Sequence, residues 1–288
     1  MAGYIILTPI KNEIKFLPQV IQSILAQNEK PALWVIIDGG STDGSVDLIT
    51  SYTKTIPHTV LVCQHKAGQT PHESVSIAVN EAYKTAKACC NVLKIDYDYI
   101  WTIDGDQTLE PSVCGGIFAK CKEDPNIGAA SGMIWNPDGT EDTYPEGELP
   151  NKRVYSKKAI DDIGGFPVTK YSYDSVILAK LRMKGYKIVA FPEFKITNLR
   201  SDSGIERDSW KSHVVFGRAR WYLGYSFPLL VAGCGYLTLK KQPVKAVGIF
   251  YGYLSSWFNG DEQIKDESIR NHFGKDRLKE IFGGGKHE

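Results

Sequence analysis

The chain has 288 residues, and its 34 lysines and arginines nearly balance 33 aspartates and glutamates, giving a formal net charge of +1. Such a balance argues against a dedicated nucleic-acid-binding protein, which carries a strong basic excess, so no nucleic-acid partner is expected. With 42% hydrophobic and 23% charged residues, the composition excludes a disordered chain and a polytopic membrane protein. A chain of this length buries a large core, so folding requires neither disulfides nor a structural metal.

The six cysteines do not form a recognisable metal site or disulfide framework. No C-x-x-C pair occurs, and Cys89 and Cys90 are adjacent. Cys114 and Cys121 are seven residues apart on one face of a predicted helix, which indicates core positions. This usage is typical of a reducing compartment. No basic segment precedes an apolar one near residue 1, so the sequence shows no secretory signal and predicts a cytoplasmic protein.

The first hundred residues alternate between strand and helix patterns. Short apolar strands separated by helices predict βαβ units, and therefore a parallel sheet covered on both faces. The predicted strands are 4–8, 34–37, 59–63 and 99–103, and the predicted helices are 16–25 and 72–90. Residues 136–152 form a polar loop, which is either a substrate-side loop or a solvated connection. Beyond about residue 196 the chain becomes helical and aromatic, so we predict domains at 1–200 and 201–288.

The first of three acidic features is Asp38, which closes a predicted strand. Ligands of open α/β sheets bind just outside the carboxyl ends of the strands, where Asp38 is expected. The glycines that follow allow a tight turn and close approach of the backbone to a ligand. Ser41 or Thr42 is a candidate N-cap for the next helix. Ordinary turn chemistry also explains this segment.

The second feature is Asp104-Gly105-Asp106, at the end of the predicted strand 99–103. Two carboxylates one residue apart can address one divalent cation, and hard oxygen ligands suit Mg²⁺ or Mn²⁺ when a substrate diphosphate completes the coordination. A solvated loop that merely separates two acids is the alternative. His213 is a candidate third ligand or a structural histidine.

The third feature is Asp174, which precedes a helical pattern that runs to Gly185. A single carboxylate among aromatic and apolar residues suits a general base. The same residue type at this place also suits an N-cap for the helix. The pattern alone leaves both interpretations open.

Together these segments resemble inverting, family-2-type glycosyltransferases of the GT-A fold. The resemblance covers roughly residues 4–195, and its pieces follow one another in the order that the family has. They are LTPIKNE (7–13), QSILAQ (22–27), IIDGGSTDGS (36–45), DYIWTIDGDQTLEP (98–111), IDDIGGF (160–166), YSYD (171–174) and KGYKI (184–188). The resemblance implies a Rossmann-like α/β domain with a mostly parallel sheet flanked by helices, followed by a helical C-terminal extension at the membrane interface.

The resemblance also implies roles for individual residues. Asp38 and Glu13 would contact the base and ribose of a nucleotide-sugar donor, and Thr8 and Pro9 would shape the same pocket. Asp104 and Asp106 would hold Mn²⁺ or Mg²⁺ against the diphosphate, with Asp106 the more direct ligand. Asp174 would remove the proton from the acceptor hydroxyl. The implied enzyme adds one sugar to a saccharide or lipid-linked acceptor.

Several positions depart from the family pattern. Tyr173 stands where an acidic residue usually precedes the base, and Lys180 stands where arginine is commoner. The segment Gly217-Arg218-Ala219-Arg220-Trp221 is similar to the Q-x-x-R-W element of processive members, but glycine replaces the glutamine. This replacement favours single addition.

The C-terminal region contains two apolar stretches, 221–239 and 246–258. The first has no charged residue, yet glycines and Pro228 interrupt it and basic residues flank it. Aromatic residues with basic flanks are typical of a segment at the membrane interface. Packing within a soluble protein, an oligomer contact and a spanning helix are the alternatives. Interfacial docking would place the protein at the cytoplasmic face of a membrane.

Three other functions compete with this interpretation. Asp104-Gly105-Asp106-Gln107-Thr108 also fits the D-x-D-x-T pattern of haloacid-dehalogenase-type phosphatases, in which Asp104 would be the nucleophile. That motif normally follows the first strand, whereas three βα units precede it in this chain. A nucleotidyltransferase and a non-catalytic scaffold of GT-A fold are the other two.

Overall fold

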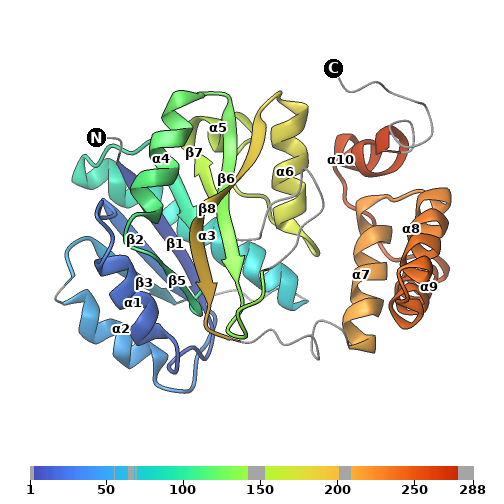
Figure 1. Cartoon of the computed structure of the whole chain (residues 1–288), viewed down its shortest axis with the longest axis horizontal. Coiled ribbons are helices and arrows are strands. Elements are labelled where there is room, and N and C mark those ends of the chain that lie inside the picture. Colours follow the sequence, from blue (N-terminus) through green and yellow to red (C-terminus); the bar gives the residue numbers. More distant parts are fainter. Residues whose placement is uncertain are drawn as a thin grey trace. The chain divides into compact units, whose positions relative to one another are not determined.

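The chain forms two compact units, residues 1–201 and 202–288, each of which is described by itself. The structure is a computed structural model that describes residues 3–54, 56–63, 68, 70–141, 153–200 and 209–277. The N-terminal unit is an α/β domain built on one sheet, and the C-terminal unit is helical (Figure 1).

The sheet of the N-terminal unit has eight strands in the order β3-β2-β1-β4-β7-β6-β8-β5. The strands are β1 (Tyr4–Ile10), β2 (Leu33–Asp38), β3 (Thr59–Cys63), β4 (Tyr99–Thr102), β5 (Gln107–Leu109), β6 (Ile127–Trp135), β7 (Arg153–Ser156) and β8 (Lys187–Asn198). The first four in this order are parallel to one another, as the βαβ pattern predicts. β7 is antiparallel to β4 and β6, and β5 is antiparallel to β8, so the second half of the sheet is mixed.

Helices cover both faces of this sheet. They are α1 (Leu17–Leu25), α2 (Ser45–Thr53), α3 (Pro71–Leu93), α4 (Val113–Glu123), α5 (Lys157–Asp162) and α6 (Tyr173–Met183). The buried side chains of α1, α2 and α4 pack on one face, and those of α3, α5 and α6 pack on the other. The α/β class inferred from the sequence, a sheet flanked by helices, is confirmed.

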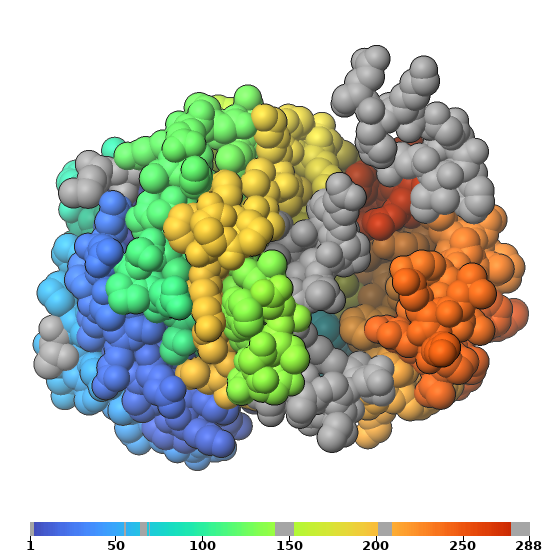
Figure 2. Space-filling model, in the orientation of Figure 1, coloured from blue at the N-terminus to red at the C-terminus, as the bar shows by residue number. Residues whose placement is uncertain are grey.

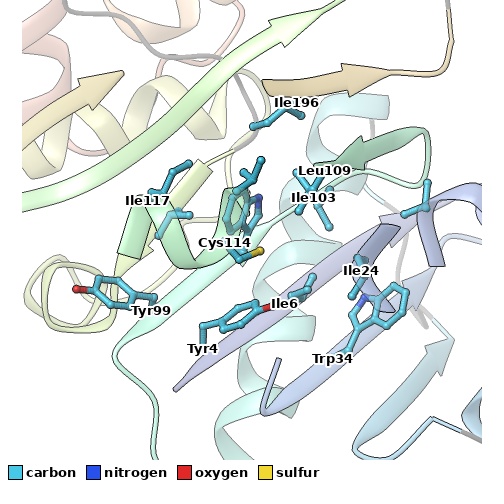
Figure 3. Packing of buried hydrophobic residues seen from close by; sticks show 14 of the residues in the cluster. Tyr4, Ile6, Ile24, Trp34, Tyr99, Ile103, Leu109, Cys114, Ile117 and Ile196 are labelled. Carbon is cyan, nitrogen blue, oxygen red and sulfur yellow. The ribbon is translucent and has the colours of Figure 1, made fainter. Parts of the chain in front are cut away.

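The two cores follow directly from the alternation of side chains along buried strands. In β1, Tyr4 and Ile6 point into one core whereas Ile5 and Leu7 point into the other. Figure 3 shows Tyr4 and Ile6 packed with Trp34 of β2. Each large apolar side chain that is fully buried contributes roughly 1.5–3 kcal/mol to stability, so the central strands hold the strand ends in place.

The C-terminal unit consists of packed helices. They are α7 (Trp210–Leu223), α8 (Phe227–Leu239), α9 (Pro243–Phe258), α10 (Glu267–Asn271) and the short π-helix η1 (His272–Asp276). Leu230 of α8 packs with Ile249 and Tyr253 of α9. Among the residues that the structure describes, none of the helices combines the length and the apolar character needed to cross a bilayer.

The charge-free stretch 221–239 is divided between two helices. Gly224 adopts the left-handed conformation (φ +84°) that ends α7, and Pro228 lies in the first turn of α8. His213 of α7 is buried against α9, where a Cβ at Gly248 would come within 2.5 Å of the His213 Cβ. This packing explains the histidine structurally.

The six cysteines are all unpaired thiols. Cys114 and Cys121 are buried on α4, as their spacing predicts, and burial raises the pKa of each thiol to about 12. Of the polar loop 136–152, only residues 136–141 lie within the described part of the chain, and there Trp135 and Glu141 form an antiparallel bridge.

Candidate active site

The carboxyl ends of β1, β2 and β4 lie side by side at one edge of the sheet. In the parallel register Ile10 is opposite Asp38, and Leu7 is opposite Thr102. Asp38 and the Asp104–Asp106 loop therefore leave the sheet at the same edge, which is where open α/β sheets bind ligands.

Asp38 organises the turn that follows β2. Its buried carboxylate accepts hydrogen bonds from the backbone N–H of Gly40 (3.0 Å) and of Ser41 (3.1 Å). Gly40 adopts a φ of +86°, which a residue with a side chain rarely adopts. The helix α2 begins later than predicted, with Gly44 at the N-cap, so the expectation of a Ser41 or Thr42 N-cap is wrong.

The residues after β1 are joined to this turn by hydrogen bonds in both directions. The N–H of Asn12 donates to the Ser41 hydroxyl (2.8 Å), and the N–H of Thr42 donates to the Asn12 side-chain oxygen (2.8 Å). The N–H of Glu13 donates to Ser45 Oγ (3.0 Å). The motifs at 7–13 and 36–45, separate in the sequence, thus form one wall of the site.

Thr8 and Pro9 contribute to this wall in different ways. Thr8 is fully buried, and its hydroxyl accepts a hydrogen bond from the indole N–H of Trp34 (2.9 Å). Pro9 is partly exposed near the end of β1. The Thr8 side chain therefore stabilises the core between β1 and β2, and Pro9 offers the accessible surface.

The loop Asp104-Gly105-Asp106 packs directly against Glu13. A Cβ on Gly105 would lie 2.9 Å from the Glu13 Cγ and 3.0 Å from the Ile10 Cγ2, so only glycine allows this approach. The backbone oxygen of Asp106 accepts a hydrogen bond from the N–H of Leu199 (2.7 Å). The acidic loop is therefore held between the segment after β1 and the end of β8.

Arg200 joins two of the predicted site acids, and no motif in the sequence pointed to it. Its guanidinium forms an ion pair with the Glu13 carboxylate, and its Nε lies 3.3 Å from Asp106 Oδ2. Desolvation raises the pKa of Glu13, the Arg200 guanidinium opposes this, and the Asp106 carboxylate adds to the increase. The Glu13 and Asp106 carboxylates concentrate negative charge here, and the Arg200 guanidinium contacts both of them.

The chemistry of these carboxylates is suitable for binding a divalent metal ion. Asp104 and Asp106 offer hard oxygen ligands, which Mg²⁺ and Mn²⁺ prefer. Within the described ranges, no group of three His, Cys, Asp or Glu side chains is arranged to hold a metal. A cation bound by Asp104 and Asp106 would have coordination positions open to a substrate diphosphate.

Asp174 lies in the first turn of α6, and Ser172 is the N-cap, so the N-cap alternative for Asp174 is wrong. A guanidinium nitrogen of Arg153 lies 3.6 Å from Asp174 Oδ2. Arg153 is paired in register with Thr102 of β4, two residues before Asp104. Asp174 is thereby linked through Arg153 to the β4–β7 pairing, near the end of β4 from which the acidic loop extends.

The α/β sheet flanked by helices fits the GT-A fold, and the family match shows that the protein is a glycosyltransferase. The chain belongs to glycosyl transferase family 2, whose model matches residues 5–174. This membership confirms the resemblance inferred from the motifs, and the haloacid-dehalogenase-type alternative is wrong. No curated protein sequence matches the chain.

Several solved structures share the fold. TarS from S. aureus is 14% identical with a TM-score of 0.53, over 74% of this chain and 38% of that chain. Mannosyltransferase PcManGT from Pyrobaculum calidifontis, in complex with GDP-Man and Mn2+, is 14% identical with a TM-score of 0.58, over 90% and 88%. GalNAc-T7 with UDP, GalNAc and Mn2+ is 11% identical with a TM-score of 0.52, over 70% and 44%.

Proposed function

We propose that the protein transfers one sugar from a nucleoside diphosphate sugar to a hydroxyl of a saccharide or lipid-linked acceptor, with inversion at the anomeric carbon. The observation that supports the proposal is the contact of Asp174 with Arg153, whose backbone pairs with Thr102 at the carboxyl end of β4, two residues before Asp104. An in-line displacement needs a base on the acceptor side and positive charge on the leaving-group side. Asp174 would supply the base, and a cation held by Asp104 and Asp106 would supply the positive charge.

On the donor side, Asp38 and Glu13 bind the base and ribose, and Thr8 and Pro9 shape the pocket. The hydrogen bonds between the segments 11–14 and 38–45 support this role, because a preformed wall loses little entropy when it binds a nucleoside. GDP-Man is bound in the PcManGT structure, and UDP is bound in that of GalNAc-T7.

Asp104 and Asp106 would hold Mn²⁺ or Mg²⁺ beside the donor diphosphate. A bound divalent cation supplies positive charge that stabilises the departing diphosphate. Mn2+ is present in the PcManGT and GalNAc-T7 structures. Because Arg200 contacts Asp106 and Glu13, its guanidinium adds positive charge at the same place.

Asp174 acts as the general base. It accepts the proton of the acceptor hydroxyl while the acceptor oxygen forms its bond to the anomeric carbon and the bond to the diphosphate oxygen breaks. Because attack and departure occur on opposite sides of the carbon, the configuration inverts. A positioned base of this kind contributes on the order of 10²–10⁴-fold to the rate.

The C-terminal unit provides contact with a membrane surface, which suits a lipid-linked or nascent polysaccharide acceptor at the cytoplasmic face. The α8–α9 turn supports this proposal. Leu239 and Val244 flank the turn with 85% and 63% of their surfaces exposed, next to Lys240 and Lys241. Exposed apolar residues beside lysines fit the boundary between headgroups and acyl chains.

The donor site is tested by thermal-shift measurements with UDP, GDP and dTDP, each with and without Mn²⁺. We expect one nucleotide to stabilise the protein in the presence of Mn²⁺, and Asp106→Ala to abolish that stabilisation. Asn126→Ala, on the exposed connection before β6, is the matched control and should respond as the wild type does. No Mn²⁺-dependent stabilisation by any of the three would contradict the donor-site assignment.

The base is tested separately by Asp174→Asn. This substitution removes the base without touching the acidic loop, so transfer should fall by at least about 100-fold while the nucleotide response is kept. The anomeric configuration of the product, measured by NMR, tests inversion, and its mass tests single addition. Transfer at the wild-type rate by Asp174→Asn would exclude this residue as the base.

A further inference from the structure

Arg153 is a buried cation whose task the reaction described above does not state. It begins β7, and only 2% of its side chain is exposed. Burial of a charged group costs several kcal/mol unless partners compensate it, so the partners of a buried guanidinium indicate why it is there.

The contacts of Arg153 reach both the side chain and the main chain of Asp174. One terminal nitrogen lies 3.6 Å from Asp174 Oδ2, and the other donates a hydrogen bond to the Asp174 backbone carbonyl (3.2 Å). The Tyr155 side chain is a further hydrogen-bond partner of Arg153, so the guanidinium joins β7 to both the carbonyl and the carboxylate of Asp174 in the first turn of the helix. A contact to the carboxylate alone would leave the helix end free to shift.

The start of α6 lacks the usual local support. Ser172 is the N-cap, but its side chain makes no capping hydrogen bond, and its φ is +50°. A non-glycine residue in this left-handed region carries a conformational cost that the surrounding structure must compensate. The contacts from Arg153 of β7 to Asp174, two residues after Ser172, provide such compensation.

The two partners differ in how accessible they are to a substrate. Asp174 keeps 18% of its side chain exposed, whereas Arg153 is shielded behind it. Arg153 also shares a rung of the sheet with Thr102, whose hydroxyl donates to the Arg153 carbonyl oxygen (3.4 Å). Arg153 thus contacts Asp174 through its side chain, and through its backbone it pairs with Thr102, two residues before Asp104.

We propose that Arg153 is a positioning residue, which aims the Asp174 carboxylate at the acceptor and fixes its distance from the acidic loop through the β4–β7 pairing. The inference rests on the proposed role of Asp174 as the base. Because Arg153 is buried and Asp174 is the more exposed of the two, we expect Arg153 to touch neither acceptor nor donor. Its loss should therefore reduce kcat and leave nucleotide binding unchanged.

The test compares Arg153→Met and Arg153→Lys with a control, Arg182→Met. Arg182 lies in the last turn of α6, the helix whose first turn contains Asp174. A misplacement of a reacting group by about 1 Å costs on the order of 100-fold in rate, so Arg153→Met should lower kcat by about this factor. The KM of the donor and the Mn²⁺-dependent thermal shift with nucleotide should stay unchanged. Arg153→Lys, which keeps the charge but loses the fork geometry, should recover part of the rate. Arg182→Met should behave as the wild type.

The outcomes separate this inference from the proposed function. Full transfer by Asp174→Asn would overturn both. An inactive Asp174→Asn together with a normal kcat in Arg153→Met, or equal losses of kcat and nucleotide binding in Arg153→Met, would overturn the positioning role alone. If Arg153→Met does not fold, the thermal stability of Arg153→Lys is compared in the wild-type and Asp174→Asn backgrounds. A smaller loss in the Asn background supports the coupling, and equal losses overturn it.

Discussion

His72 lies in the first turn of α3 near the proposed base, and we expect it to make the stability of the protein depend on pH. Its ring centroid lies 6.1 Å from that of Tyr171. Desolvation lowers the pKa of His72 below its usual 6.5, and the nearby Asp174 carboxylate opposes this decrease. Between the two pKa values of His72, the unfolded chain binds a proton that the folded chain does not. The free energy of unfolding should therefore decrease as pH is lowered from about 7 through this range.

Measurement of the melting temperature of the wild type and of His72→Gln between pH 8 and pH 5 tests this prediction. The carboxylates that also titrate in this range are common to both proteins, so the difference between the two curves isolates His72. The curve of His72→Gln should be the shallower one. Parallel curves would mean that His72 has the same pKa in the folded and unfolded chains.

At the scale of single residues, the sequence predicted the acids but not the cations that hold them. Asp38 ends a strand, Asp104 and Asp106 follow one, and Asp174 lies in the first turn of a helix, and such positions can be read from local patterns. Arg153 and Arg200 act on residues that are distant in sequence, and neither belongs to a motif. The signal that could have found them is electrostatic, because acids gathered at one edge require compensating positive charge.

Two glycines determine how closely α7 and α9 approach each other. A Cβ on Gly252 would lie 2.1 Å from the backbone oxygen of Val214, and a Cβ on Gly217 would lie 2.1 Å from that of Ile249. These are contacts with backbone, which cannot rotate away. The glycine at 217, where the processive family element has glutamine, is thus required for helix packing.

We therefore predict that Gly252→Ala destabilises the C-terminal unit by about 1–3 kcal/mol or more, the usual range for overpacking. Gly235→Ala in α8 is the matched control, since a Cβ added there would meet no atom of the described residues within 4 Å, and helix propensity favours alanine by roughly 0.5–1 kcal/mol. Urea unfolding followed by tryptophan fluorescence measures both effects. Equal stability of the two variants would contradict the close packing of α7 on α9.

At the scale of helices and strands, the buried strands of the first hundred residues were predicted, whereas the buried strands β6 and β7 were not. Strands such as β2 are buried along their whole length, so a continuous apolar run identified them. β7 pairs antiparallel with β4 and β6, and β5 pairs antiparallel with β8. These pairings depend on the path of the chain across the sheet, which no local sequence pattern contains. The start of α2 was misplaced because the Ser41 hydroxyl bonds to Asn12 rather than to the helix.

At the scale of the whole molecule, the balance of charge conceals an uneven distribution. The net charge of +1 is too small to attract the protein to an anionic membrane. The α8–α9 turn, in contrast, joins Lys240 and Lys241 to exposed apolar residues, and α8 and α9 form the orange surface in Figure 2. Membrane binding, where it occurs, should therefore depend on this turn and not on overall charge.

The decisive measurement is sedimentation of the full chain with vesicles of phosphatidylcholine alone or with phosphatidylserine. Each lysine near an anionic surface is worth about 1 kcal/mol, so Lys240→Gln with Lys241→Gln should weaken binding to anionic vesicles by about 30-fold. Leu239→Ser should weaken it on both kinds of vesicle, because burial of a leucine is worth roughly 1.5–3 kcal/mol. Lys265→Gln, beyond the far end of α9, is the control and should bind normally. If the wild type ignores vesicles but self-associates through Leu239, the exposed turn is a protein contact and the membrane proposal fails.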